Sequence, residues 1–205
     1  MDYNIIIVYI ATSVERSYNM ASWLLPDYIF STYKDVTPNF LREIGVNALL
    51  IDIDNTLAPY EMPEPDDNIR EWFKSLAENG IKATLVSNND RERVELFNAT
   101  LSLPAYYKSG KPFAKNLKKA MAAMGSDKHD TAMLGDQLLT DAAAGKHIGL
   151  RTIIVPPIRD KNNAFFRSKR AMEVGHIKKY VKIHGDASRE VCAFWIEKKY
   201  KKNNR

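Results

Sequence analysis

The feature that most constrains the fold of this chain is an alternation of short apolar runs with longer amphipathic stretches over residues 46–157. The runs "VNALLIDID", "IKATLVSNN" and "DTAMLGDQ" each have the length of a buried strand. The first amphipathic stretch, "DDNIREWFKSLAENG", places four apolar side chains on one helical face: Ile69, Trp72, Phe73 and Leu76. Repetition of strand and helix predicts an α/β fold of three Rossmann-like layers, in which helices cover both faces of a central parallel sheet.

The remaining stretches extend this pattern. Helices are predicted for "DRERVELFNATL", where Val94, Phe97 and Leu101 are in phase, for "KPFAKNLKKAMAAMG" and for "TDAAAGKHIG". A short strand is predicted for "PAYYKS" and a last strand for "RTIIVPP". In such sheets ligands bind at the carboxyl ends of the strands, so residues that carry chemistry are expected there.

Four polar clusters fall at those positions. They are Asp52-Ile53-Asp54-Asn55-Thr56, Ser87-Asn88-Asn89, Lys111-Pro112, and Gly135-Asp136 with Asp141. Each cluster alone is a weak signal, but the carboxyl ends of parallel strands share one edge of the sheet. The four clusters are therefore expected to form one site.

In this order, the motifs "DIDNT", "VSNN", "GKP" and "GDQLLTD" resemble those of the haloacid dehalogenase (HAD) superfamily of phosphohydrolases. The resemblance covers Val46 to Pro157 and implies an Mg²⁺-dependent phosphatase that forms an aspartyl-phosphate. By this resemblance Asp52 is the nucleophile and Asp54 the general acid and base. Thr56 is expected to orient Asp54 through its hydroxyl group.

The resemblance also implies the Mg²⁺ ligands: Asp52, Asp136 and the backbone carbonyl of Asp54. Asp141 is expected to hold a metal-bound water or to orient a partner, or alternatively to be an ordinary helix N-cap.

Phosphoryl oxygens are expected to bind to the Ser87 hydroxyl, to the N–H groups of Ser87 and Asn88, and to the charge of Lys111. The alternatives without a function are that Ser87 is an ordinary turn residue and that Lys111 is a solvated residue at the start of a helix.

The spacing of the motifs leaves no room for a cap domain. Only about 30 residues separate Thr56 from Ser87, and about two dozen separate Ser87 from Lys111, and the predicted elements use most of them. An uncapped site suits a large or surface-bound substrate.

A finer resemblance covers Leu24 to Gly185. The segments "LLPDYIFSTYKDVTPNFLREIGVNALLIDIDNTLAPYE", "KPFAKNLKKAM" and "GDQLLTDAAAGKHIGLRTIIVPPI" resemble the bacterial class IIIA phosphatases of the YqeG type. These are similar to the mitochondrial phosphatidylglycerophosphate phosphatases, which implies phosphatidylglycerophosphate as substrate. The alternatives are a soluble phosphomonoester (nucleotide, sugar phosphate or phosphoprotein) and a non-catalytic protein bound to RNA or ribosomes.

The charge of the chain is distributed unevenly. Residues 159–205 carry 14 Lys and Arg against 5 Asp and Glu, whereas residues 1–158 carry 16 against 20. A basic end suggests an anionic partner, with a membrane surface favoured over nucleic acid, or simply a solvated tail. The expected division is an N-terminal extension at 1–19, the phosphatase domain at 20–185 and a basic tail at 186–205.

Two segments are candidates for membrane contact. One is "SWLLPDYIFSTY", with the aromatic residues Trp23, Tyr28, Phe30 and Tyr33, for which packing on the sheet is the favoured alternative. The other is "AFFRSKRAMEVGHIKKYVKIHG", for which an interfacial helix and a packed helix are equally supported, while Gly175 weakens any helix. Its apolar residues are Phe165, Phe166, Met172, Ile177 and Val181, and its basic ones are Arg167, Lys169, Arg170, Lys178, Lys179 and Lys182.

A lone cysteine, Cys192, excludes an intramolecular disulfide framework and suits a reducing compartment. We expect it to be structural. The longest apolar run, "IIIVYIA", is far shorter than the roughly 20 residues a spanning helix needs, and no signal peptide is evident. The expected location is the cytoplasm, with peripheral attachment at the inner face of the membrane.

Overall fold

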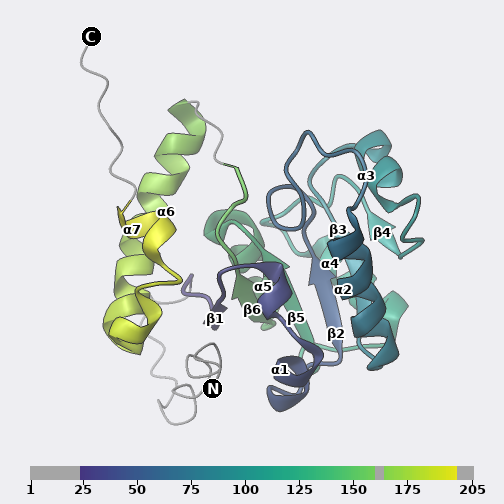
Figure 1. Ribbon diagram of the computed structural model, residues 1–205, viewed down its shortest axis with the longest axis horizontal. Helices are drawn as coiled ribbons and strands as arrows, with labels where there is room; N and C mark the ends of the chain where they lie inside the picture. The colour runs from purple at the N-terminus through teal and green to yellow at the C-terminus, as the bar shows by residue number, and fades with distance from the viewer. Residues whose placement is uncertain (1–23, 160–163, 198–205) are drawn as a thin grey trace.

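The computed structural model describes residues 24–159 and 164–197, and of residues 164–167, 187 and 197 only the backbone. Six strands form one parallel sheet in the order β1-β6-β5-β2-β3-β4 (Figure 1). The strands are β1 (Tyr28–Ile29), β2 (Ala48–Ile51), β3 (Lys82–Val86), β4 (Ala105–Tyr106), β5 (Thr131–Gly135) and β6 (Arg151–Ile154). The predicted parallel α/β architecture is confirmed.

The order of the strands positions the site. From β2 the chain steps outward to β3 and β4, and then returns to the other side of β2 to form β5 and β6. Leu50 of β2 therefore pairs with Thr84 on one side and with Met133 on the other. The direction of winding reverses between β2 and β5, and the crevice at their carboxyl ends is the place where such folds bind ligands.

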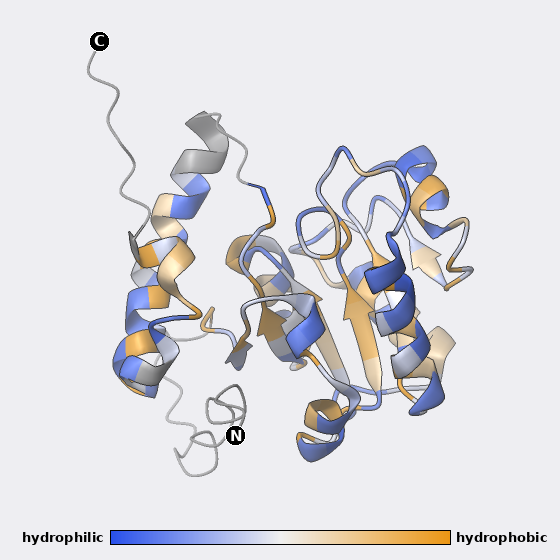
Figure 2. Cartoon of the chain, viewed as in Figure 1, coloured by the Kyte–Doolittle hydropathy of each residue, from blue (hydrophilic) through white to orange (hydrophobic). Residues whose placement is uncertain are grey.

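Helices cover both faces of the sheet. They are α1 (Pro38–Glu43), α2 (Asp67–Glu78), α3 (Arg91–Asn98), α4 (Lys115–Met124), α5 (Ala143–His147), α6 (Ala164–His184) and α7 (Ala193–Glu197). Alternate residues of β2 serve opposite faces. Leu49 packs in one buried cluster with Phe73 of α2, whereas Leu50 packs in another with Leu117 of α4. Figure 2 shows the result, apolar strands between helices with hydrophilic outer faces.

No cap domain is present in the described part of the chain between the first two motifs. After Thr56 the structure has one isolated bridge at Ala58, then α2 and β3, and then Ser87. Asp66 caps α2, since its side chain accepts a hydrogen bond from the Ile69 N–H at 2.8 Å.

Three helix predictions need correction. The helix predicted to start at Lys111 begins at Lys115, so Lys111 and Pro112 lie in the loop before α4. The helix that starts at Arg91 ends at Asn98, short of Leu101, because the Asn98 side chain bonds the N–H and carbonyl of Leu103 and turns the chain toward β4. The stretch predicted as one helix from Thr140 instead begins at Leu138 with a π-helical turn that leads into α5.

The C-terminal segment forms an outer part of the fold beside β6 and β1 (Figure 1). Helix α6 runs without a break through Gly175, so this glycine does not end it. Ile177 and Tyr180 of α6 are buried in one cluster with Ile154 of β6 and with Trp195 of α7. Packing thus continues past Gly185, where the sequence suggested that the domain ends.

The packed alternative also holds for the N-terminal aromatic segment. Tyr33 is buried, and the rings of Tyr28 and Phe30 lie edge-on to Phe40 at 5.1 and 4.8 Å between centroids. Trp23, and the extension expected at 1–19, lie outside the described residues, as do the side chains of Phe165, Phe166 and Arg167.

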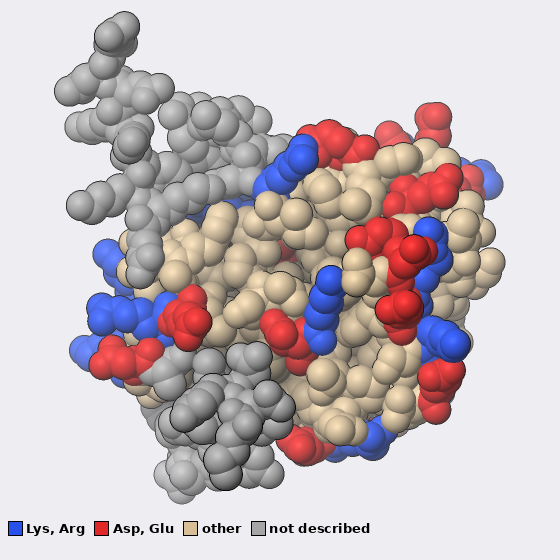
Figure 3. All heavy atoms as spheres, viewed as in Figure 1, with Lys and Arg blue, Asp and Glu red and all other residues tan. Residues whose placement is uncertain are grey.

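Cys192 is fully buried, as expected for a structural cysteine. No helix in the ranges 24–159 and 164–197 combines the length and apolar character that crossing a bilayer requires. Figure 3 shows Lys and Arg side chains interspersed with Asp and Glu side chains over one face of the molecule, near its centre as well as at its rim.

Candidate active site

The four sequence clusters meet at the carboxyl edge of the sheet. A cleft of about 260 Å³ opens there, and its lining includes Asp52 and Asp54 after β2, Ser87 and Asn88 after β3, and Gln137 after β5. Lys111 reaches the same place from the loop before α4. The expected convergence of the clusters is therefore what the structure shows.

Lys111 joins two of the clusters. Its Nζ lies 2.6 Å from Asp52 Oδ1 and 2.7 Å from Asp141 Oδ1, and all three residues are buried. Burial alone would lower the pKa of Lys111, but the carboxylates of Asp141 and Asp52 raise it above its ordinary value. Lys111 is therefore a fixed positive charge at the bottom of the cleft and not a solvated helix-start residue.

The loop that carries Lys111 is held by Asn88. The Asn88 Oδ1 accepts hydrogen bonds from the Lys111 N–H and the Ser109 hydroxyl, both at 2.9 Å. Its Nδ2 donates to the Lys111 carbonyl at 2.9 Å. The side chain of Asn88 thus positions Lys111.

The expectations for Thr56 and Ser87 each need one correction. The Thr56 hydroxyl donates to Asp52 Oδ2 at 3.1 Å and so orients Asp52, not Asp54. The Ser87 N–H donates to the carbonyl of Tyr106 at 2.9 Å as part of the sheet, which leaves it unable to bind a phosphoryl oxygen. The Ser87 hydroxyl does face the cleft, 3.5 Å from Asp54 Oδ2.

Asp54 has a partner that the sequence did not reveal. Arg93 of α3 holds Asp54 Oδ1 with Nε at 3.1 Å and a terminal nitrogen at 3.0 Å, and Asn89 Nδ2 donates to Oδ2 at 3.1 Å. Arg93 thus occupies Oδ1, and Oδ2 is the oxygen of Asp54 that faces Ser87 in the cleft.

Three carboxylates form a possible metal centre. Asp52, Asp136 and Asp141 are buried, and one oxygen of each lies within 4.8 Å of the others. Asp136 Oδ1 has no hydrogen-bond partner among the described residues. An unpartnered buried oxygen beside two other carboxylates fits a hard divalent cation such as Mg²⁺. The Asp54 carboxylate does not belong to this group.

The electrostatics of this group point the same way. Burial raises the pKa of Asp52 to about 7, with Lys111 opposing the rise and Asp141 and Asp54 adding to it. Burial also raises the pKa of Asp136 well above its ordinary value. Carboxylates crowded into a buried site need positive charge to remain ionised, and a bound cation supplies it.

Asp141 is not a helix N-cap. Its Oδ2 accepts a hydrogen bond at 3.0 Å from the N–H of Gln137, four residues before it, while its other oxygen faces Lys111. Its side chain also lies against Gly135, where an added Cβ would stand 2.3 Å from Asp141 Cγ. The motif therefore requires glycine at position 135.

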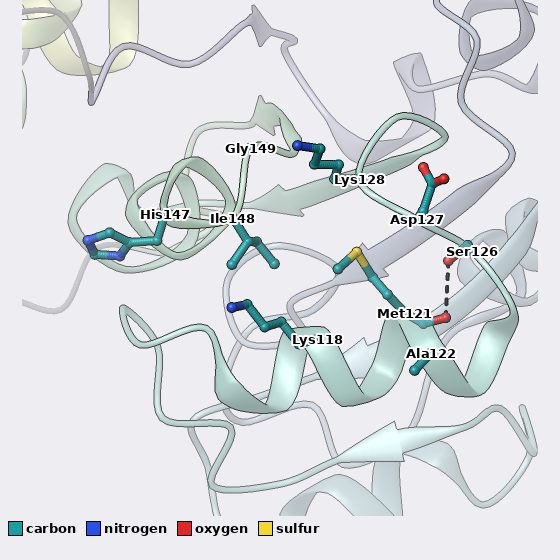
Figure 4. Close-up of a pocket in the computed structure, with 9 residues that line it drawn as sticks. All are labelled: Lys118, Met121, Ala122, Ser126, Asp127, Lys128, His147, Ile148 and Gly149. Carbon is teal, nitrogen blue, oxygen red and sulfur yellow. Dashed lines mark hydrogen bonds between the residues drawn. The ribbon is translucent and has the colours of Figure 1, made fainter.

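A larger hollow of about 610 Å³ lies elsewhere, between α4 and the turn after α5 (Figure 4). Met121 and Ile148 lie on its walls, with Lys118, Lys128 and His147 around them. None of the strand-end residues lines it, so its size does not make it the site of the chemistry.

A parallel sheet with an aspartate pair, a buried lysine and an acidic cluster at its carboxyl edge defines a class of phosphate-ester hydrolases. The chain belongs to the haloacid dehalogenase-like hydrolases, whose family model matches residues 32–149. It is a phosphatase of that family.

Among curated proteins, the chain is 37% identical over 154 residues to the "Probable phosphatase YqeG" of Bacillus subtilis (strain 168), covering 75% of this chain and 90% of that protein. It is 31% identical over 105 residues to the "Pyrophosphatase PpaX" of Halalkalibacterium halodurans, and the match covers 46% of this chain and 48% of that protein. Among solved structures, the cobalt-bound deoxy-D-mannose-octulosonate 8-phosphate phosphatase of Haemophilus influenzae has a TM-score of 0.42 at 17% identity. The match covers 67% of this chain and 92% of that one.

Proposed function

We propose that this chain is an Mg²⁺-dependent phosphomonoester hydrolase that works through an aspartyl-phosphate on Asp52. The observation that carries the proposal is the contact of Lys111 with Asp52 beside the Asp136 and Asp141 carboxylates. A nucleophile, a fixed cation and a metal centre within one cleft are what an anionic phosphate ester requires.

In the first step an oxygen of Asp52 attacks phosphorus and the bond from phosphorus to the ester oxygen breaks. Asp54 gives its proton to the departing alkoxide, so that an alcohol leaves. Lys111 balances the negative charge of Asp52 and of the phosphoryl oxygens. The Thr56 hydroxyl holds the other oxygen of Asp52 and so fixes the direction of attack.

In the second step water attacks phosphorus and Asp54 takes up its proton. The bond from phosphorus to Asp52 breaks, inorganic phosphate leaves, and Asp52 is again a carboxylate. The Ser87 hydroxyl, which faces the cleft, is placed to donate a hydrogen bond to a phosphoryl oxygen in both steps.

Asp52, Asp136 and the Asp54 carbonyl would hold Mg²⁺, with Asp141 beside them. When bound, the cation stabilises negative charge on the phosphoryl oxygens.

For the substrate we propose phosphatidylglycerophosphate. Support comes from the open, capless cleft and from its rim, where Lys169 offers positive charge and Tyr60 is partly exposed. The exposed apolar side chains of Phe113 and Ile158 belong to segments that adjoin site residues Lys111 and Asn55. Such a rim suits a lipid head group at an anionic membrane, approached from the cytoplasm.

A soluble phosphomonoester fits the chemistry of the cleft equally well, and it is the second candidate. The set of site residues argues against a purely RNA-binding role.

The test is phosphate release from phosphatidylglycerophosphate in mixed micelles, with Mg²⁺ or with EDTA, beside p-nitrophenyl phosphate as a generic ester. We expect Mg²⁺-dependent release from the lipid that is lost in Asp52→Asn. Turnover of the generic ester alone would retain the phosphatase mechanism and reject the lipid. Absence of turnover of any ester, together with salt-sensitive RNA binding, would favour the binding protein.

A further inference from the structure

The buried charges of α6 lie against the metal centre, and the proposed mechanism does not yet use them. Arg170 and Glu173 are only 4% and 1% exposed, and Asp136 is 0% exposed. The sequence supports an interfacial and a packed position of this helix equally, and Arg170 faces inward. Buried charges are costly to place, so their partners indicate what they do.

Arg170 forms two hydrogen bonds with Asp136. One terminal nitrogen of its guanidinium lies 2.9 Å from Asp136 Oδ2, and the other donates to the backbone carbonyl of Asp136 at 3.2 Å. This arrangement occupies Oδ2 and leaves Oδ1 without a partner among the described residues. The guanidinium therefore fixes the rotation of the carboxylate while one oxygen remains for a cation.

Glu173, one turn further along α6, binds both Arg170 and the loop after β5. Its Oε2 lies 2.7 Å from the Arg170 nitrogen that also bonds the Asp136 carbonyl. Its Oε1 accepts a hydrogen bond from the Leu138 N–H at 3.0 Å. The two side chains together hold the loop after β5 at a carboxylate, a carbonyl and an amide.

The C-terminal helices pack around these contacts. The guanidinium of Arg170 lies 5.9 Å from the ring centroid of Phe194 in α7. Burial would lower the pKa of Arg170, but Glu173 and Asp136 raise it above its ordinary value, so the guanidinium stays charged. Both acidic partners are thus compensated by one permanent cation.

We propose that Arg170 and Glu173 are positioning residues for the metal centre, which makes α6 a working part of the phosphatase site. The inference rests on the proposed metal-dependent function. Both residues lie beyond residue 149, where the match to the family model ends. Residues that orient a metal ligand typically change metal affinity by about 10–100-fold when they are replaced.

The test is calorimetric titration of the full chain with MgCl₂, comparing wild type, Arg170→Met, Arg170→Lys and Glu173→Gln. We expect Mg²⁺ affinity about 10–100-fold weaker in Arg170→Met, with a smaller loss in Arg170→Lys, which keeps the charge but not the two-point grip. Turnover of p-nitrophenyl phosphate by these variants should recover as Mg²⁺ is raised, because the nucleophile and Lys111 are intact.

The matched control is Arg189→Met. Arg189 also pairs with an acidic residue three positions away, Asp186 at 3.5 Å, but the two side chains are 64% and 92% exposed. Wild-type affinity is expected for this variant.

If folded Arg170→Met binds Mg²⁺ within twofold of wild type, the inference is wrong while the proposed function stands. Should that variant fail to fold, Glu173→Gln decides: it keeps the size of the side chain and an acceptor for Leu138, and unchanged affinity would reject the inference. If the wild type itself binds no Mg²⁺, the metal-dependent function fails and the inference fails with it.

Discussion

The ammonium group of Lys111 lies 2.6 Å from the carboxylate of Asp52, although 58 residues separate them in the chain. Both side chains are nearly excluded from water, so the pair is a structural unit as well as part of the chemistry. Asp141 shares the same ammonium group at 2.7 Å. Removal of the lysine would leave two buried carboxylates facing each other.

Replacement of Lys111 by methionine should therefore affect both activity and folding. We expect kcat to fall by about 100-fold or more, because a charge that stabilises the transition state is lost. We also expect the free energy of unfolding in EDTA to fall by about 3–5 kcal/mol, the usual cost of leaving a buried ion pair without one partner. Lys119→Met, which removes an exposed lysine of α4, is the control and should change neither quantity. Wild-type kcat in Lys111→Met would remove this residue from the mechanism.

Thr56→Val tests the hydrogen bond to the nucleophile. The substitution keeps the shape of the side chain and removes the donor to Asp52 Oδ2. A hydrogen bond to a charged group contributes about 1.5–3 kcal/mol, so we expect kcat to fall by about 10–100-fold with little change in KM. Steady-state kinetics with p-nitrophenyl phosphate measure both parameters, and an unchanged kcat would show that Asp52 needs no such support.

Thr84→Val should stabilise the protein. Thr84 of β3 is fully buried, and its hydroxyl has no hydrogen-bond partner among the described residues. Replacing it by a methyl group of similar shape removes an unsatisfied polar atom, so we expect stabilisation by about 1 kcal/mol and wild-type kcat. Urea unfolding measures the difference. Destabilisation would indicate that the hydroxyl does have a partner, for example a buried water.

Cys192 reports on the packing of α6 and α7. Burial raises the pKa of its thiol to about 12, so at pH 8 only about one molecule in ten thousand carries the reactive thiolate. We expect no reaction of the native chain with a disulfide reagent over hours, and one thiol per chain in urea. Because the pKa is raised, the reactive form stays scarce until the pH nears 12. Fast labelling of the native chain at pH 8 would mean that these helices detach readily.

Lys169→Met tests the recognition of the substrate at the rim of the cleft. Lys169 lines the cleft, and the proposed lipid substrate carries a second anionic group besides the phosphate that is removed. We expect the KM of this variant for the lipid to rise by about tenfold, since an ionic hydrogen bond to substrate contributes about 1.5–3 kcal/mol. Its KM for p-nitrophenyl phosphate should not change. Lys178→Met, an exposed lysine of the same helix, is the control. Equal effects on both substrates would argue against a role in selecting the lipid.

Most of the fold could be predicted because its determinants are local. Buried strands, an amphipathic helix with Asp66 at its start and polar residues at strand ends are all visible in the sequence. Parallel strands then bring Asp52, Ser87 and Asp136 to one edge without further information. The prediction was wrong where a polar side chain has several nearby partners to choose from: Asn98 bonds Leu103, five residues on, and ends α3, and Thr56 turns to Asp52 instead of Asp54.

Two arginines of the site, Arg93 and Arg170, were not predicted as site residues. Arg93 lies on an amphipathic helix and Arg170 in a basic stretch, and such arginines are usually exposed. Only the packing of α3 and α6 against the sheet shows that one holds Asp54 and the other Asp136. Nothing in the local sequence separates these two from the solvated arginines around them.

The central claim is that Asp52 carries the phosphoryl group, and Asp54→Asn offers the most direct test. With p-nitrophenyl phosphate the leaving group needs no proton, so the first step should proceed, whereas the second lacks its base. We predict a burst of p-nitrophenolate approaching one per chain, with the phosphoryl group located on Asp52 by mass spectrometry of acid-quenched peptides. A phosphoryl group on another residue, or steady turnover by this variant without any phosphorylated chain, would contradict the account.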